Sequence, residues 1–408
     1  MIFGKGRHEN RINSLSFRTL KTEPWLETQP EPSRDTAREE GYAVPLPWWR
    51  KQSFMLIALS AAVAVFVGGL LFWYHGRALA AERVLEPDRM MTAAPEPKPL
   101  DPLLEDGENI RSPSSYRGKT TTLEVGETDI YRGFLVLVND SHILPDYYLP
   151  ENLAIVNDMA TNADVDGLSV TKPGMELNET VAEMLLVMVG SAQKESEVGG
   201  WLLQSAYRDF TYQNYLHQRK VEEYRSMGFG DEEARRSAAF WVARPRESEH
   251  HTGLAMDLSS RTHPDLQLTY ANTVNGRWLA ENCRRFGFII RYPEEKSDLT
   301  KVGFEPWHIR YVGFPHSEFI PLKGWCFEEY LEFLRKEGGY TYRDEAGAVW
   351  QVDYQVLNGS AIEAPADLLY TVSGDGEGGF IVTTLLEGPV DNTTGEELLL
   401  IAGKRLSD

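Results

Sequence analysis

The pattern of hydrophobic and polar residues between 122 and 340 predicts a mixture of amphipathic helices and short strands. Apolar residues recur at helical spacing after Asn178, at Val181, Met184, Leu185, Met188 and Ala192. Further helices are predicted at 212–227, 276–286 and 327–334, the second ending at Gly287. Runs of β-branched and aromatic residues predict strands at 130–138, 201–206, 288–291 and 307–311. We therefore expect an α+β fold with a small antiparallel sheet and flanking helices.

Beyond Gly339 the pattern changes to strands without helices. Strands are predicted at 349–356, 368–372 and 380–385, with the glycine-rich segment 374–379 as the turn of a plain hairpin. This turn lacks the lysine of a phosphate-binding loop and the ligand spacing of a calcium loop. The sequence therefore predicts a small β-rich C-terminal domain at 341–408.

Residues 53–74 form an uncharged, apolar run of about the 20 residues that cross a bilayer. Aromatic residues border both ends, and Arg50 and Lys51 precede it. Because the run begins after fifty residues, we interpret it as an uncleaved transmembrane helix and not as a signal peptide. The slight excess of Lys and Arg on its N-terminal side predicts that the N-terminus is cytoplasmic.

The segments on either side of the apolar run differ in composition from the rest of the chain. Residues 1–52 are polar and aperiodic, which predicts a disordered cytoplasmic tail. Residues 75–121 are rich in Pro, Glu and Asp, as in an extended extracytoplasmic linker. We therefore expect a single-pass protein of the cell membrane, with its folded part on the extracytoplasmic side.

Composition and charge narrow the possible functions of the folded part. The 408 residues are 42% hydrophobic, enough for a packed core. A net charge of −20 argues against nucleic acid as a partner, because phosphates require clustered Lys and Arg. The two cysteines, Cys283 and Cys326, could form one disulfide or remain buried thiols. The helix-like surroundings of Cys283 favour thiols.

His250 and Asp257 are the first candidates for a metal site. A regular helix would separate them by about 10 Å along its axis, too far for one ion. A loop that leads into a strand can bring them together, and Gly253 permits the bend. Ala255 and Asp257 would then share one face of that strand. A surface loop that happens to contain two histidines, His250 and His251, is the alternative.

Glu305 and His308 lie about fifty residues further along, next to Pro306, which cannot sit inside a helix. They therefore differ from the helical HExxH arrangement of many zinc proteases. Two imidazoles and one aspartate would supply three zinc ligands and leave one position for water. The remaining carboxylate, Glu305, could take a proton from that water. One of the histidines would donate its second ring N–H to an oxygen outside the metal shell.

The pattern Ser-x-His-x-x-Gly-x-Ala-x-Asp at 248–257 resembles the signature of VanY-type D-alanyl-D-alanine carboxypeptidases. Residues 287–293 and 305–313 resemble the second half of the same family, and residues 204–208 resemble its substrate-binding segment. The similarity covers roughly 122–335. It implies a zinc carboxypeptidase domain, which we place at 122–340.

The resemblance also implies roles for individual residues. His250, Asp257 and His308 would hold one zinc ion, and Glu305 would be the general base. Arg208 would bind the free carboxylate of the peptide, for which a planar guanidinium is well suited. An ordinary surface salt bridge is the alternative for Arg208.

Three more residues are predicted to bind substrate or to line the pocket: Tyr207, Gln213 and Ser248. His251 is expected to point away from the metal. The family usually has glycine where this chain has Ala206, and a small hydroxyl residue where it has Asp209. A second carboxylate beside Arg208 could weaken its grip on the substrate.

The function implied by the resemblance is removal of the terminal D-alanine from peptidoglycan stem peptides. An L,D-carboxypeptidase acting on tetrapeptides and a D,D-dipeptidase acting on free dipeptide are the nearest alternatives. An endopeptidase and a non-enzymatic wall-binding protein are more distant ones.

Overall fold

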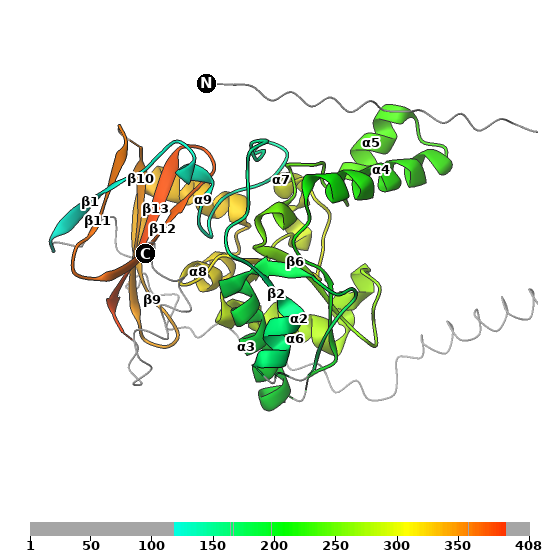
Figure 1. Ribbon diagram of the computed structural model, residues 1–408, viewed down its shortest axis with the longest axis horizontal. Coiled ribbons are helices and arrows are strands. Elements are labelled where there is room, and N and C mark those ends of the chain that lie inside the picture. The colour runs from blue at the N-terminus through cyan, green and yellow to red at the C-terminus, as the bar shows by residue number, and fades with distance from the viewer. Residues whose placement is uncertain (1–117, 164, 166, 197, 358, 389–408) are drawn as a thin grey trace, which may run out of the picture. The chain divides into compact units, whose positions relative to one another are not determined.

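The computed structural model describes residues 118–388 apart from 164, 166, 197 and 358, all of them within one unit of the chain (Figure 1). The predicted tail, the predicted transmembrane helix and nearly all of the predicted linker lie outside these residues. Within the described part, no helix combines the length and the apolar character needed to cross a membrane.

Five strands form the central sheet in the order β3-β5-β6-β8-β7. Neighbours from β5 to β7 are antiparallel, as predicted, but β3 and β5 are parallel. This parallel pair arises because helix α3 (Glu179–Ser196) intervenes between the two strands and provides the crossover. The strands are β3 (Leu168–Val170), β5 (Trp201–Ser205), β6 (Ala255–Ser260), β7 (Phe288–Ile290) and β8 (His308–Tyr311).

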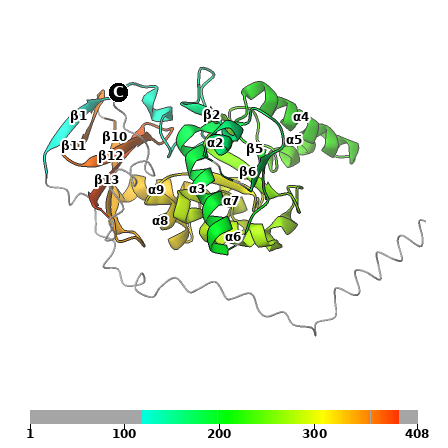
Figure 2. The same ribbon diagram turned by 60° about the horizontal axis from the view of Figure 1, so that its bottom comes forward.

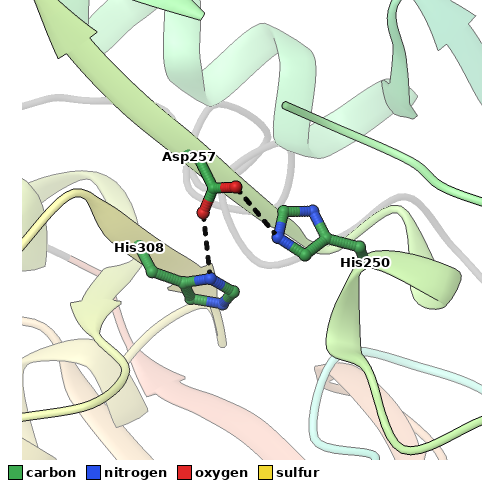
Figure 3. A group of neighbouring side chains, drawn as sticks. All are labelled: His250, Asp257 and His308. Atoms are coloured by element: carbon green, nitrogen blue, oxygen red, sulfur yellow. Dashed lines mark hydrogen bonds and ion pairs between the residues drawn. The ribbon is translucent and has the colours of Figure 1, made fainter. Parts of the chain in front are cut away.

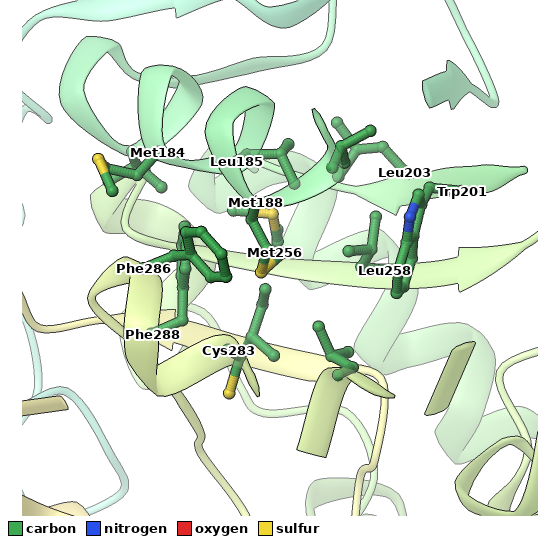
Figure 4. Packing of buried hydrophobic residues seen from close by; sticks show 14 of the residues in the cluster. Met184, Leu185, Met188, Trp201, Leu203, Met256, Leu258, Cys283, Phe286 and Phe288 are labelled. Atoms are coloured by element: carbon green, nitrogen blue, oxygen red, sulfur yellow. The ribbon is translucent and has the colours of Figure 1, made fainter. Parts of the chain in front are cut away.

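Strand alternation gives this sheet an apolar face and a polar face. Met256 and Leu258 of β6 pack in the main hydrophobic core beneath α3 (Figure 4). Ile309 of β8 belongs to the same core. Asp257 and His308 occupy the intervening positions, so they face the opposite side of the sheet. All five apolar residues predicted for the buried face of α3 are buried.

All four helices that the sequence predicts are present, as α3, α4, α6 and α9, whereas α2, α5, α7 and α8 were not predicted. The predicted helix 276–286 is α6 (Val274–Asn282) followed by one 3₁₀ turn, η5 (Cys283–Phe286), and it ends at Gly287 with φ +81°. Helix α5 was not predicted, because only Ala234 and Ala238 of its residues are buried and they mark no apolar stripe. The other helices are α2 (Val156–Asn162), α4 (Phe210–Ser226), α5 (Asp231–Ala239), α7 (Ser297–Thr300), α8 (His316–Leu322) and α9 (Phe327–Glu337).

The predicted strand at 130–138 is wrong. This segment begins within the 3₁₀ turn η2 (Asp129–Tyr131) and continues without regular structure. Its residues Leu135 to Val138 are all buried, because they run between two packed layers. The carbonyls of Phe134 and Val136 accept hydrogen bonds from the Arg310 side chain, not from a neighbouring strand. The sequence cannot distinguish a buried strand from a hydrophobic run whose carbonyls accept hydrogen bonds from a distant side chain.

The C-terminal β-rich part contains a four-stranded antiparallel sheet in the order β12-β13-β10-β9. The glycine-rich hairpin turn is confirmed, and the Asp375 carboxylate accepts hydrogen bonds from the backbone N–H groups of residues 377–379. A second, two-stranded sheet pairs β11 with β1, the first strand of the described chain (Figure 2). These strands are β1 (Thr120–Glu124), β9 (Gly339–Arg343), β10 (Val349–Val356), β11 (Ala361–Pro365), β12 (Leu369–Gly374) and β13 (Gly379–Glu387).

One hydrophobic cluster joins the two parts. Phe319 of α8 and Leu331 of α9 pack with Tyr340 of β9 and Ile381 of β13. Cys283 and Cys326 are both buried free thiols, as expected. A short two-stranded sheet, β2 (Leu153–Ile155) with β4 (Glu176–Asn178), leads into α3.

We predict that Gly287→Ala destabilises the fold more than Gly324→Ala. Both glycines have positive φ, +81° and +64°, which costs about 1–2 kcal/mol for an L-residue. A Cβ at 287 would also overlap the Tyr311 ring, adding about 1–3 kcal/mol for overpacking, whereas the space around Gly324 is open. Urea unfolding of the two variants tests this difference. Equal losses of unfolding free energy would contradict the packing described for the end of η5.

Candidate metal centre and substrate cavity

The pairing of β6 with β8 brings the first two candidate ligands together. Asp257 and His308 are directly opposite each other in this antiparallel pair. Cβ atoms of such pairs are about 4.5–5.5 Å apart, so their side chains meet on the shared face. His308 Nδ1 is 3.1 Å from Asp257 Oδ1 (Figure 3).

His250 reaches the same point from the turn that precedes β6. It lies in the 3₁₀ turn η3 (Glu249–Thr252), which ends at Gly253 with φ +71°. Its Nδ1–H donates to the carbonyl of Ala206 at 2.7 Å, which directs Nε2 toward Asp257 Oδ2, 3.4 Å away. The oxygen that was expected to accept the second ring N–H is therefore, for His250, a backbone carbonyl. A turn that leads into a strand brings His250 and Asp257 together, as predicted.

The three side chains fit the demands of a zinc ion. One ligand atom from each of His250, Asp257 and His308 lies within 4.8 Å of the others, and all three residues are buried. A tetrahedral zinc with bonds of about 2.0–2.2 Å separates its ligand atoms by about 3.3–3.6 Å. Each histidine nitrogen lies at close to this separation from one oxygen of Asp257: His250 Nε2 is 3.4 Å from Oδ2, and His308 Nδ1 is 3.1 Å from Oδ1. Two nitrogens and one carboxylate oxygen form a typical catalytic zinc set.

The protonation states of His250 and Asp257 also suit a cation. Burial and the nearby charge of Arg208 lower the pKa of His250 to about 4, which leaves its Nε2 lone pair available. Burial alone would raise the pKa of Asp257, but His250 and Arg208 hold it well below its usual range. Burial opposes the positive form of His308, yet the nearby carboxylates of Asp257, Glu249 and Glu305 raise its pKa to about 9. A metal ion would therefore compete with a proton at His308.

Glu305 lies beside the three candidate ligands and faces the cavity. The chain turns at Pro306 and Trp307, which places Glu305 Oε2 3.5 Å from His308 Nδ1. Burial raises the pKa of Glu305 to about 8, with a further contribution from Asp257 and an opposing one from His308. A carboxylate with a raised pKa is suited to exchange protons near neutral pH.

These side chains lie at the end of a cavity of about 730 Å³. Helix α4 forms one wall, and the segments after α5 and around η4 (Leu268–Asn272) contribute others. Among the described residues that line it, the predicted site contributes Arg208, Gln213, Ser248, His250, Asp257, Glu305 and His308.

Arg208 is held at the metal end of the cavity by three contacts. Its guanidinium donates to Ser205 Oγ at 2.6 Å, to Gln213 Oε1 at 3.2 Å and to Asp257 Oδ2 at 2.5 Å. It is therefore not an ordinary surface salt bridge. Gln213 is fully buried, and its Nε2 donates to the Ala243 carbonyl, so it orients Arg208.

The other predicted pocket residues differ in position. Ser248 is buried, precedes η3 and lines the cavity. Tyr207 is not among the described residues that line the cavity, and its backbone N–H donates to the backbone carbonyl of Glu176. The predicted conflict between Asp209 and Arg208 is resolved by helix capping. The Asp209 carboxylate accepts the backbone N–H of Tyr212 at the start of α4.

His251 points away from the candidate metal ligands, as expected, but it has a structural role. Its Nδ1–H donates to the carbonyl of Arg208 at 2.6 Å, and its Nε2 accepts the backbone N–H of Arg246 at 3.0 Å. It thereby ties the segment that carries Arg208 to the segment that leads into η3.

Several residues near the site were not predicted to have a role. Tyr292 and Trp307 line the cavity, and the Tyr292 ring lies 4.8 Å from that of His308. Glu249, Arg291 and Arg310 form a buried ionic cluster next to the metal ligands. All three belong to segments that carry the family resemblance, but only their burial distinguishes them from surface charges.

Comparisons with known proteins show the family of this chain. A family model described as VanY, D-alanyl-D-alanine carboxypeptidase, matches residues 174–314. A D-alanyl-D-alanine carboxypeptidase of Enterococcus faecium is 31% identical over 278 residues, which are 68% of this chain and 82% of that protein. The putative carboxypeptidase YodJ of Bacillus subtilis (strain 168) is 36% identical over 206 residues, 50% of this chain and 68% of that protein.

A solved structure gives the same result. The vancomycin-resistance D,D-dipeptidase VanXYg, in complex with a D-Ala-D-Ala phosphinate analogue, matches with a TM-score of 0.54 and 26% identity. The match covers 66% of this chain and all of that chain. The chain belongs to the VanY family of D-alanyl-D-alanine carboxypeptidases. It is a metallocarboxypeptidase, and the predicted family is confirmed.

Proposed function

We propose that this protein is a zinc-dependent D,D-carboxypeptidase that removes the terminal D-alanine from peptidoglycan stem peptides. The observation that carries the proposal is the convergence of His250, Asp257, His308 and Glu305 beside Arg208 at one end of a cavity. The names of the similar proteins point to the same reaction.

Each polar residue of the site has a definite task in this reaction. His250, Asp257 and His308 would hold the zinc ion. When bound, zinc polarises the scissile carbonyl and acidifies its water. Glu305 accepts a proton from the attacking water and delivers it to the leaving amine, which its position 3.5 Å from His308 Nδ1 permits.

Arg208 restricts cleavage to the last peptide bond. Only the carboxylate of Asp257 separates its guanidinium from the metal position, because Arg208 Nη2 lies 2.5 Å from Asp257 Oδ2. One extended residue spans about 3.3–3.6 Å. A peptide whose terminal carboxylate binds Arg208 therefore presents its final peptide bond to the metal and to Glu305.

The length of the cavity favours a carboxypeptidase over a D,D-dipeptidase. The cavity extends from the metal ligands along α4, past Leu216 and Lys220 to Glu223. A free dipeptide would not need this outer part, whereas a longer stem peptide would occupy it. A D,D-dipeptidase remains the second candidate, because VanXYg bears that name.

A defined pentapeptide that ends in D-Ala-D-Ala provides the direct test. We expect loss of one D-alanine, seen by mass spectrometry, and no loss after zinc is removed with a chelator. Cleavage of a tetrapeptide would instead indicate L,D-carboxypeptidase activity. Cleavage of free D-Ala-D-Ala would indicate dipeptidase activity. Unchanged cleavage without metal would contradict the proposal.

We predict that Glu305→Gln abolishes most turnover but leaves zinc bound. The amide cannot accept the water proton, and loss of a general base typically costs about 10²–10⁴-fold in rate. Turnover and zinc content should be measured on the same preparation. His308→Ala is the control, which we expect to lose zinc as well. If the Glu305→Gln variant turned substrate over at the wild-type rate, Glu305 would be excluded as the general base.

We predict that amidation of the peptide's C-terminus lowers kcat/KM far more for the wild-type enzyme than for the Arg208→Lys variant. Loss of a charge-assisted pair of hydrogen bonds costs about 1.5–3 kcal/mol, or roughly 10–150-fold in kcat/KM. Lysine keeps the charge but not the bidentate contact, so amidation should cost this variant less. Both proteins are compared with saturating zinc, because Arg208 also contacts Asp257. An equal amidation cost in both would exclude Arg208 as the carboxylate-binding residue.

We also propose that residues 53–74 anchor the enzyme in the cell membrane, with the catalytic part outside. The uncharged apolar run and the flanking aromatic residues support this proposal. The full chain should sediment with membranes, and protease added outside intact cells should remove its catalytic part. Recovery of the full chain in the soluble fraction would contradict the proposal.

A further inference from the structure

The second ring nitrogen of His308 has no hydrogen-bond partner. His308 Nδ1 faces Asp257, whereas Nε2 is buried on the other side of the ring. A nearby polar atom is Glu249 Oε2, 3.8 Å away, which is also buried without a hydrogen-bond partner. Two buried and unsatisfied atoms of complementary chemistry therefore face each other, where an unmade hydrogen bond costs stability.

The Glu249 carboxylate is fixed in place by two arginines. Its Oε1 accepts hydrogen bonds from Arg291 Nε and Arg310 Nη1, both at 2.7 Å. All three side chains are fully buried. Since both strong contacts use Oε1, the carboxylate holds Oε2 toward His308.

Further contacts anchor the arginines to other parts of the fold. Arg291 makes a bidentate pair with Glu328 of α9, at 2.9 and 2.6 Å. Arg310 Nη2 donates to the carbonyls of Phe134 and Val136. The cluster therefore connects the strands of the site to α9 and to the buried segment that precedes β2.

We propose that Glu249 is a positioning residue that accepts the Nε2–H of His308 and thereby presents Nδ1 of this histidine to the metal. This inference depends on the metal-binding role proposed above for His308. A shift of less than 1 Å brings the two atoms from 3.8 Å to hydrogen-bond distance. The contact fixes both the tautomer and the ring plane of the ligand.

A role as counter-ion alone does not explain this geometry. Glu249 and Glu328 together balance the charges of Arg291 and Arg310, but charge balance does not set the direction of Glu249 Oε2. A carboxylate that served only the arginines would direct both oxygens at them. One oxygen is instead directed at His308.

The two histidine ligands are therefore supported differently. His250 donates to a neutral backbone carbonyl through Nδ1, whereas His308 faces a carboxylate through Nε2. A carboxylate partner makes an imidazole a stronger electron donor than a carbonyl does. We accordingly expect zinc affinity to depend on Glu249.

The test compares zinc affinity in Glu249→Gln with that in Glu328→Gln, whose carboxylate binds Arg291 in the same cluster. Both variants perturb the same buried cluster, but only the first changes the group that faces His308. Affinity is measured on the full chain by competition with a chromophoric chelator, and thermal unfolding of the metal-free proteins records the general loss of stability. We expect Glu249→Gln to bind zinc about 10–100-fold more weakly, a loss that Glu328→Gln does not share.

A loss of less than about fivefold in Glu249→Gln, or an equal loss in Glu328→Gln, would overturn the proposal. If Glu249→Gln does not fold, Glu249→Asp is held to the same limit, because it withdraws the carboxylate by one methylene. In the zinc-loaded wild type, ¹H–¹⁵N NMR should also show a slowly exchanging Nε2–H of His308, and its absence would count against the contact. Zinc binding without carboxypeptidase activity would remove the proposed function and leave this inference standing.

Discussion

The register between β6 and β8 is the constraint on which the site depends. Asp257 and His308 meet because they are directly opposite each other, although 51 residues separate them in sequence. A shift of one residue would turn Asp257 toward the core beneath α3 and expose Met256 and Leu258 on the polar face. The packing of that core therefore selects the register that assembles the candidate metal ligands.

The remaining groups are held mainly by backbone and buried contacts. The Ala206 carbonyl orients His250, the Arg208 carbonyl binds His251, and Gln213 orients the Arg208 guanidinium. Such contacts leave the polar side chains little freedom, so the site is organised before substrate arrives. The C-terminal β-rich part contributes indirectly, because it packs on α8 and α9 next to the buried ionic cluster.

The sequence predicted the parts of the molecule that follow local rules. The buried face of α3 follows from helical spacing, and the shared face of Ala255 and Asp257 follows from strand alternation. The irregular structure of segment 130–138 could not be predicted, because two of its carbonyls, those of Phe134 and Val136, are bound by Arg310, more than 170 positions away. The role of Glu249 could not be predicted either, because it also depends on contacts with residues far away in the sequence. In the sequence, Glu249 between Ser248 and His250 resembles an ordinary surface charge, because only long-range packing buries it.

Zinc-edge anomalous diffraction from crystals of the protein tests the central claim most directly. The account predicts one strong anomalous peak, bonded to His250 Nε2, a carboxylate oxygen of Asp257 and His308 Nδ1. A zinc peak at another place, or none between these three side chains in zinc-saturated crystals, would contradict it.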